Sequence, residues 1–437
     1  MTNIIYIVAD DLGYADLGCY GGREAQFGQV SPNIDKLAKE GLMFHNGYSN
    51  SPVCSPTRFA LMSMAYQYRL RGALEEPMST ATRYSKTLGL PPEVPTLPSL
   101  LKKAGYQTAL VGKWHLGYPP HFGPRASGYD AFFGIMAGGV DYFSHKSSRD
   151  EHDLWSNEEK SGEIGYLTDL ISDKAVDFVN SQGGDSEAKP FFLSVHYTAP
   201  HWPWETRDDE HLSDQITSLG HLEGGNIHTY RKMIHHMDEG IGRIMAALEA
   251  HGLTQDTLIV FTSDNGGERF SDNWPLVGGK MDLTEGGIRV PWIVRWPAVV
   301  TPGTSSDQHC MTMDFSRTLL AAGGGEVDPN YPVDGVSLLS VLKGESASFE
   351  RPLYWRMKHR QQRALRVGPW KYLKVDEQEY LFNVDNDARE RANLSKIKPE
   401  KLAAMKQQWL DWNATMPAIP EDAVVSLVYS TEDMPQR

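Results

Sequence analysis

The chain has 437 residues, and its 40% hydrophobic content is enough to form a substantial buried core. Its formal net charge of -14 argues against a nucleic-acid partner and against binding to an acidic membrane surface, although a local basic pocket remains compatible with it. The three cysteines, Cys19, Cys54 and Cys310, are too few for a disulfide framework.

The chain begins almost directly with an apolar, strand-like stretch at residues 3–8, with no signal peptide ahead of it. No apolar run in the sequence is long enough to cross a membrane. We therefore expect a cytoplasmic protein without a membrane partner, or a periplasmic or secreted one if a leader was trimmed from the sequence.

The first predicted strand, residues 3–9, is apolar almost throughout, which is typical of a parallel strand covered on both faces. It is followed at once by Asp10 and Asp11. In open α/β sheets, ligands gather at the carboxyl ends of strands, so two adjacent carboxylates there indicate a hard metal ion. A solvated turn is the plain alternative. A capped helix is expected over residues 31–41, where a serine and a proline precede an apolar stripe.

The next segment reads Cys54-Ser55-Pro56-Thr57-Arg58. Pro56 suits the first turn of a helix, and a helix that starts there would place Cys54 at its amino end, near unpaired N–H donors. Helical side chains tilt toward the amino end, so the Arg58 guanidinium would point to the same place. This combination is typical of a nucleophile in an anion site. A buried thiol before an ordinary helix is the alternative.

Two further strands are followed by basic residues or histidines. The strand predicted at 107–111 leads to Lys113 and His115, which would share one face of an extended segment. The strand predicted at 191–197 leads to His201, which stands between two prolines in a rigid turn. These placements favour contacts to a ligand, although a surface lysine and packed histidines are the plain alternatives.

A last strand, predicted at 257–262, is followed by Asp264 and Asn265, a second pair of hard oxygen donors. Two such pairs at strand ends favour a shared cation. Lys280 follows two glycines shortly afterwards and adds another cationic group suited to an oxyanion. The long amphipathic helix predicted at 227–250 carries its methionines at core spacing, so they are not interpreted as a metal site.

Alternating strands and helices predict an α/β domain over residues 1–349, built on a large mixed, mainly parallel sheet with helices on both faces. Residues 118–165 look like an irregular insertion on the substrate side. Short, closely spaced strands and a final helix predict a C-terminal subdomain at 350–437 with an antiparallel sheet. The apolar segment 424–429 needs a partner surface, either its own domain or another subunit of a homo-oligomer.

With these motifs assembled, the chain resembles the type I, arylsulfatase-like sulfatases of the alkaline-phosphatase superfamily. The matching motifs extend over most of the chain: Ile7-Val8-Ala9-Asp10-Asp11-Leu12-Gly13-Tyr14, Cys54-Ser55-Pro56-Thr57-Arg58, Gly112-Lys113-Trp114-His115-Leu116-Gly117, Ala199-Pro200-His201, Thr262-Ser263-Asp264-Asn265-Gly266, and Gly279-Lys280 before Glu285-Gly286-Gly287. The resemblance implies an alkaline-phosphatase-like fold.

The resemblance also implies that a formylglycine-generating enzyme oxidises Cys54 to Cα-formylglycine. It implies a single metal ion, Ca²⁺ in most relatives with Mg²⁺ or Mn²⁺ as alternatives. The implied ligands of that ion are Asp10, Asp11, Asp264, Asn265 and the modified Cys54.

The implied reaction is hydrolysis of a small-molecule or carbohydrate sulfate monoester to sulfate and an alcohol or phenol. The hydrated formylglycine would be the nucleophile, with Arg58 and the metal favouring its alkoxide and His115 deprotonating its second hydroxyl. The sulfuryl oxygens would be held by Lys113, His201 and Lys280. Either His201 or Lys280 would protonate the leaving oxygen.

Two other functions stay open at this point. The same scaffold could hydrolyse phosphate or phosphonate esters, since both transition states carry negative charge on peripheral oxygens. A non-catalytic relative could bind sulfated ligands through an unconverted Cys54. The flank after the cysteine motif departs from the family, which commonly continues to Thr-Gly-Arg where this chain has Met62-Ser63-Met64-Ala65-Tyr66.

Overall fold

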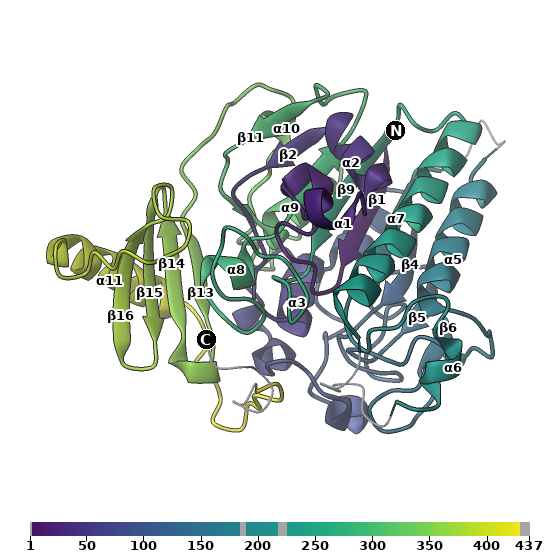
Figure 1. Cartoon of the computed structure of the whole chain (residues 1–437), viewed down its shortest axis with the longest axis horizontal. Helices are drawn as coiled ribbons and strands as arrows, with labels where there is room; N and C mark the ends of the chain where they lie inside the picture. The colour runs from purple at the N-terminus through teal and green to yellow at the C-terminus, as the bar shows by residue number, and fades with distance from the viewer. Residues whose placement is uncertain (1, 184–188, 217–224, 429–437) are drawn as a thin grey trace.

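The computed structural model describes residues 2–183, 189–216 and 225–428, and Figure 1 shows its arrangement. Within these residues, one mixed sheet contains ten strands. In sheet order they are β11 (Thr304–Ser306), β2 (Leu42–Phe44), β10 (Trp292–Arg295), β9 (Thr257–Ser263), β1 (Asn3–Ala9), β8 (Phe191–His196), β4 (Gln107–Lys113), β5 (Ala131–Ile135), β6 (Leu154–Ser156) and β7 (Glu159–Lys160). The run from β9 to β5 is parallel, and β10 and β6 are antiparallel to their neighbours in that run. The predicted mixed, mainly parallel sheet is confirmed.

Strand β1 is buried along its whole length, and its side chains alternate between two hydrophobic clusters. Ile4 and Tyr6 belong to one cluster, and Ile5 and Ile7 belong to the other. Successive side chains of a strand point to opposite faces, so helices must cover the sheet on both sides. One face is covered by α2 (Pro32–Lys39), α5 (Leu167–Ser181) and α7 (Ile227–Ala250), and the other by α3 (Cys54–Ser63), α4 (Leu97–Lys103) and α9 (Thr312–Ala322). In Figure 1, α5 and α7 lie side by side.

Helix α2 is capped differently from the sequence expectation. Ser31 precedes the helix, but its side chain makes no capping hydrogen bond. The carboxylate of Asp238 on α7 instead accepts hydrogen bonds from the backbone N–H groups of Asn33 and Ile34, at 3.0 and 2.8 Å. A carboxylate on another helix therefore satisfies the first N–H groups of α2 and ties α2 to α7.

The segment 118–165 is not the irregular insertion that its sequence indicated. It contains β5, β6 and β7, which extend the main sheet beyond β4. The expectation of a separate irregular piece is wrong because β5 pairs with β4 in parallel register, a long-range contact that local pattern does not reveal. The loop between β5 and β6 carries residues 138–142, which reach the site described below.

The C-terminal strands form a separate antiparallel sheet, as predicted, in the order β13 (Leu353–Arg356), β14 (Arg363–Val367), β15 (Trp370–Val375) and β16 (Gln378–Asn383). Helix α11 (Pro399–Asn413) packs on it, and Figure 1 shows both at the side of the main domain. A hydrophobic cluster that contains Leu353, Trp355 and Cys54 joins the C-terminal sheet to α3. The boundary between residues 349 and 350 stays a prediction.

The remaining elements are short. They are β3 (Gly47–Tyr48), β12 (Cys310–Met311), α1 (Glu24–Phe27), α6 (Glu210–Ser213), α8 (Glu285–Ile288), α10 (Leu339–Leu342), and the 3₁₀ turns η1 (Gly18–Tyr20), η2 (Gln67–Arg69), η3 (Arg71–Leu74), η4 (Thr80–Tyr84) and η5 (His359–Gln361). Among the helices of the described ranges, none has the length and apolar character needed to span a bilayer.

The predicted apolar segment 424–429 lies against its own chain as far as it is described; Tyr429 falls outside the described residues. Val425 forms a bridge with Glu76, and Val425 and Leu427 pack against the cluster that contains Cys54. The homo-oligomer stays a prediction, and this segment no longer supplies a reason for it.

Candidate active site

Four neighbouring parallel strands and two further segments bring the expected site residues together at one edge of the sheet. They are Asp264 and Asn265 after β9, Asp10 and Asp11 after β1, His201 after β8, Lys113 and His115 at the end of β4, Cys54 and Arg58 on α3, and Lys280 in the loop before α8. None of these ten residues is more than 5% exposed. So many buried polar groups in one place indicate a functional site, because polar groups are costly to bury without partners.

Helix α3 begins at Cys54, two residues earlier than Pro56 indicated. Cys54 is therefore the first residue of the helix, and Pro56 occupies its first turn, where a missing N–H is tolerated. The Cys54 side chain lines a cavity of about 190 Å³ together with His115, His201 and Lys280. The structure thus brings the predicted nucleophile and three of its predicted partners to one cavity.

Burial raises the pKa of the Cys54 thiol, against the opposite effect of Lys113 and Lys280. A cysteine nucleophile must be a thiolate, and reactive cysteines have lowered pKa values. The environment of Cys54 therefore does not activate a plain thiol.

Arg58 does not point only toward the start of its helix. Its Nη2 and Nε donate to Asp264 Oδ2 at 2.9 and 3.1 Å, and its Nη1 donates to the Lys113 carbonyl oxygen at 3.0 Å. The Arg58 and Asp264 side chains are buried completely or nearly so. Arg58 thereby fixes α3 against the ends of β9 and β4.

Two lysines pair with the acidic residues that follow β1. Lys113 Nζ lies 2.5 Å from Asp10 Oδ2, and Lys280 Nζ lies 2.7 Å from Asp11 Oδ2. Burial and the neighbouring Asp264 raise the pKa of Asp10. Asp11 is equally buried, but Lys280 and His201 bring its pKa below the usual value. The buried cluster thus contains both carboxylates and cationic side chains. The carboxylates are suited to bind a cation, and the lysines are suited to bind an anion.

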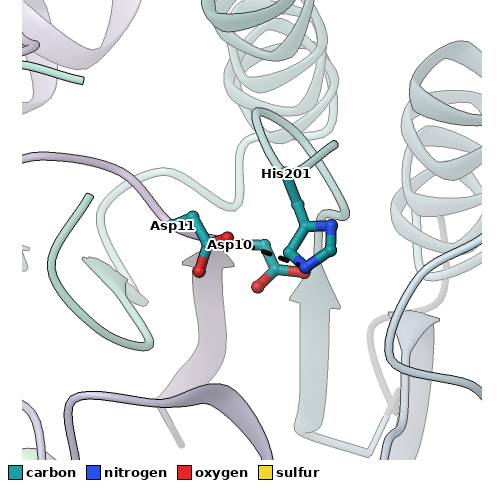
Figure 2. Close-up of side chains that lie close together, drawn as sticks. All are labelled: Asp10, Asp11 and His201. Carbon is teal, nitrogen blue, oxygen red and sulfur yellow. Dashed lines mark ion pairs between the residues drawn. The ribbon is translucent and has the colours of Figure 1, made fainter. Parts of the chain in front are cut away.

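Several of these oxygens fit a divalent cation. Asp10 Oδ1 and Asn265 Oδ1 are buried and have no hydrogen-bond partner among the described residues. One oxygen each of Asp10 and Asp11 and one ring nitrogen of His201 all lie within 4.8 Å of one another, and Figure 2 shows these three side chains converging. Carboxylate and amide oxygens are preferred ligands of Ca²⁺ and Mg²⁺. This group of three side chains includes His201, which was expected from the sequence only to bind the sulfuryl oxygens or to protonate the leaving oxygen.

His115 was expected to share an extended face with Lys113, and this is wrong in detail. His115 has a φ of 60°, so the chain turns at this residue. Its Nε2 lies 2.7 Å from the Met78 carbonyl oxygen, which can only accept, so Nε2 carries the proton. Nδ1 is buried without a partner among the described residues. The lone pair on Nδ1 is therefore available to accept a proton.

His201 is held in the opposite tautomer. Its Nδ1 lies 2.6 Å from the Trp202 carbonyl oxygen and so carries the proton, while Nε2 lies 3.6 Å from Asp11 Oδ2. Burial and Lys280 lower the pKa of His201 well below its usual value. A neutral imidazole with a lone pair on Nε2 suits a cation or an N–H or O–H donor better than it suits proton donation.

Two glycines of the loop after β5 make room for these histidines. A Cβ atom at Gly138 would lie 2.5 Å from Cε1 of His115, and one at Gly139 would lie 3.1 Å from Cε1 of His201. Both glycines line the cavity. This explains the glycines at 138 and 139: a side chain at either position would press on a histidine ring.

Several lining residues were not found from the sequence. They are Pro77, Met78, Ser79, Thr80, Ser148, Ser426 and Leu427. Trp202 packs on His201 with ring centroids 4.1 Å apart. His196 was also missed; it is buried next to the Lys113 carbonyl oxygen, at 3.3 Å from its Nδ1. The serines and threonine carry no motif, and only the apolar character of 424–429 could have drawn attention to the tail.

A comparison with protein families agrees with this geometry. The family described as Sulfatase matches residues 2–325, and the family described as N-sulphoglucosamine sulphohydrolase, C-terminal matches residues 279–411. The first match covers well over half of the chain and contains all ten expected site residues.

Individual proteins point the same way. The chain is 33% identical over 374 residues to the N-acetylgalactosamine-6-sulfatase of Homo sapiens, with 81% of this chain and 68% of that protein covered. It is 32% identical over 352 residues to arylsulfatase J of Mus musculus, with 78% and 55% covered.

Solved structures share the fold as well. The crystal structure of Ps i-CgsB in complex with k-i-k-neocarrahexaose has a TM-score of 0.83 and 33% identity, over 94% of this chain and 92% of that chain. The PsFucS1 sulfatase from Pseudoalteromonas sp. has a TM-score of 0.77 and 25% identity, over 95% and 90%.

Sulfatases in general contain a metal ion and a formylglycine, and the buried oxygen donors and the position of Cys54 are compatible with both. The chain belongs to the sulfatase family and is a sulfuric ester hydrolase.

Proposed function

We propose that this protein hydrolyses the sulfate ester of a sulfated carbohydrate, with formylglycine at position 54 and one Ca²⁺ ion. The observation that carries the proposal is the position of Cys54, the first residue of α3, in one cavity with His115, His201 and Lys280. The sugar part of the proposal is supported by the similarity to an N-acetylgalactosamine-6-sulfatase and to a structure with a bound neocarrahexaose.

The cation would be held by Asp10, Asp11, Asp264 and Asn265 together with the modified residue 54, and His201 Nε2 lies near enough to Asp11 to join them. The oxygen-rich donor set and the unpartnered oxygens of Asp10 and Asn265 favour Ca²⁺ over zinc. Hydrated formylglycine supplies a carbon that bears two hydroxyl groups, a chemistry that a thiol lacks.

The other residues of the site would bind the substrate, accept a proton or hold a neighbouring side chain in position. Lys280 lines the cavity, and Lys113 is buried in an ion pair with Asp10; both would bind the sulfuryl oxygens, where negative charge is concentrated. His115 would accept a proton at Nδ1, because its Nε2 is committed to the Met78 carbonyl oxygen. Arg58 would hold Asp264 in place through their hydrogen bond and would add positive charge close to the nucleophile.

Lys280 is the better candidate for protonating the leaving oxygen. His201 has its proton on Nδ1, where the Trp202 carbonyl oxygen accepts it, so its Nε2 carries a lone pair and no proton. Lys280 Nζ instead donates to Asp11 Oδ2 at 2.7 Å, so this group carries protons that it can give. We therefore assign Lys280 as the acid and His201 as a positioning group or cation ligand.

The proposal is tested by a substrate panel and by mass spectrometry of the peptide that contains Cys54. The panel contains nitrophenyl sulfate, sugar monosulfates, carrageenan oligosaccharides and nitrophenyl phosphate. We expect hydrolysis of sugar sulfates and a formylglycine mass at position 54. Preference for the phosphate ester would overturn the assignment in favour of a phosphatase, and a wholly unmodified thiol without turnover would favour a sulfated-ligand binder.

A further inference from the structure

The C-terminal tail is held beside residues 75–77 by a series of hydrogen bonds, two between backbone groups and two that involve a side chain. Glu76 N donates to the Val424 carbonyl oxygen at 2.9 Å, and Ser426 N donates to the Glu76 carbonyl oxygen at 3.0 Å. Val424 N donates to Glu75 Oε2 at 3.0 Å, and Ser426 Oγ donates to the Pro77 carbonyl oxygen at 2.5 Å. The tail is thus paired like a short strand with a segment far away in the sequence.

The pairing fixes which tail side chains face the protein. Val424 is 53% exposed, whereas Val425 and Leu427 are partly buried and pack against the cluster that contains Cys54. This alternation is the one expected of a strand with one face packed. Leu427 and the neighbouring Ser426 line the same cavity as Cys54.

The segment that holds the tail is itself fixed to the catalytic residues. Met78 N donates to Ser55 Oγ at 2.8 Å, directly beside Cys54. The carbonyl oxygen of Met78 accepts from Nε2 of His115 at 2.7 Å. The wall formed by residues 77–80 and the tail therefore keeps a defined position relative to the nucleophile.

The lining of the cavity combines one ionisable group with many neutral side chains. Lys280 and the two histidines are its nitrogen-bearing catalytic candidates, and Lys280 is the only lysine, arginine or carboxylate among the described lining residues. The other side chains offer an apolar surface or a neutral hydroxyl. The apolar and aromatic group is Leu427, Trp202, Met78 and Pro77, and the hydroxyl group is Ser79, Thr80, Ser148 and Ser426.

A sugar ring matches such a lining because it has apolar C–H faces and hydroxyl groups at its edges, and an aromatic ring and an aliphatic side chain suit those faces. We propose that Ser426 and Leu427 form one wall of the site for the alcohol part of the substrate, and that this wall selects a neutral sugar ring next to the sulfate ester. The inference rests on the proposed function and adds two specificity-determining residues from the tail.

The test compares Leu427→Ala and Ser426→Ala with Val424→Ala, a matched control in the same segment whose side chain is exposed and does not line the cavity. KM and kcat are measured on the best sugar monosulfate of the panel, and the inhibition constant of inorganic sulfate is measured in parallel. Leu427→Ala should raise KM for the sugar sulfate about tenfold, as expected for a lost apolar contact in a pocket. It should change kcat much less, because the contact is made equally in the ground and transition states.

Inorganic sulfate has no alcohol part that could contact the proposed wall, so its inhibition constant should stay within about twofold in all three variants. Leu427→Met keeps the volume of the side chain and should keep KM within about threefold. A melting temperature for each variant separates a wall effect from a folding effect. Equal KM values in Leu427→Ala, Ser426→Ala and Val424→Ala would contradict the proposed wall. Parallel changes in KM and in the inhibition constant of sulfate would contradict it as well.

Failure of the proposed function gives a different result, namely no turnover of any sulfate ester by the unsubstituted protein. In that case calorimetric binding of each sugar monosulfate of the panel replaces KM. Weaker binding by Leu427→Ala than by Val424→Ala would still support the wall, and equal binding would refute it.

Discussion

Arg58 and Asp264 form a completely buried ion pair in which two guanidinium nitrogens, Nη2 and Nε, reach the same carboxylate oxygen at 2.9 and 3.1 Å. The pair connects the helix that begins with Cys54 to the strand end that supplies two of the proposed cation ligands. One interaction therefore serves both stability and the geometry of the site.

Replacing Asp264 should affect stability and cation content together. Asp264→Ala leaves Arg58 as a buried charge without its carboxylate, which typically costs about 3–5 kcal/mol. Asp264→Asn keeps an acceptor oxygen and should cost less, yet it should also lower the Ca²⁺ content below one ion per chain. Urea unfolding and elemental analysis measure the two effects. Asp173→Asn, in an exposed pair with Arg243, is the control and should change stability by no more than about 1 kcal/mol. Full cation content in both Asp264 variants would remove this residue from the ligand set.

Position 54 should be essential for turnover but not for folding. Cys54→Ala should retain the melting temperature within a few degrees and lose turnover, since the side chain is small and lies at the first position of α3. Cys19→Ser is a suitable control because Cys19 does not line the cavity. The mass of the peptide with residue 54 should show formylglycine in active preparations. Full activity from a preparation that contains only the thiol would contradict the mechanism.

The assignment of the acid predicts how rate depends on the leaving group. A nitrophenolate departs as an anion, whereas a sugar alcohol needs a proton, and general acid catalysis is then worth about 10²–10⁴-fold. Lys280→Ala should therefore lose more kcat/KM on sugar sulfates than on nitrophenyl sulfate, and His201→Ala should lose similar factors on both. The measurement is kcat/KM over phenyl sulfates of graded leaving-group pKa. If only His201→Ala steepens this dependence, the two roles are exchanged; if neither does, the acid is another group.

Gly138 should be intolerant of even one methyl group. The Cβ of Gly138→Ala would lie 2.5 Å from Cε1 of His115, so the imidazole must move away from its hydrogen bond to Met78. A misplacement of about 1 Å in a catalytic group can cost about 10²-fold, and we expect a loss of this order in kcat. Gly123→Ala is the matched control, because its Cβ would meet nothing closer than 3.6 Å. Equal kcat in the two variants would show that His115 does not need this position.

Glu205 should make the stability of the protein depend on pH. Burial and the neighbouring Asp141 raise its pKa from 4.5 to about 8. The folded state thus holds this proton to a higher pH than the unfolded state, so the contribution is complete below about pH 4.5 and is lost as the pH rises to about 8.

Glu205→Gln mimics the protonated acid: its amide oxygen can still accept from Tyr142 N, as Oε2 does at 3.0 Å, and its NH₂ group can donate toward Asp141. The melting temperature of the unsubstituted protein should therefore fall relative to Glu205→Gln between pH 4.5 and 8. Glu326→Gln, at an exposed position, should follow the unsubstituted protein throughout. Parallel curves for all three proteins would show that Glu205 titrates at the same pH in both states.

The buried strands of the site and the residues that follow them could be predicted from the sequence. Apolar runs such as 3–9 and 257–262 identify buried parallel strands, and parallel strands present their carboxyl ends at one edge of a sheet. Asp10 and Asp264 were therefore expected to meet, and Asp264 Oδ1 accepts a hydrogen bond from the backbone N–H of Asp11 at 3.3 Å. This part of the site is determined locally, because each residue is fixed by its distance from the end of its own strand.

Tertiary structure alone decided the contacts between segments without a regular relationship. The tautomers of His115 and His201 depend on the carbonyl oxygens of Met78 and Trp202. No sequence motif identifies Met78 as the partner of His115. The wall of the cavity joins Pro77 to Ser426 across 349 positions of the chain. Such pairs depend on the packing of the whole molecule, because their hydrogen bonds and apolar contacts join segments that are far apart in the sequence. The sequence by itself therefore determined the chemistry at the strand ends, and the folded chain decided which side chains surround the substrate.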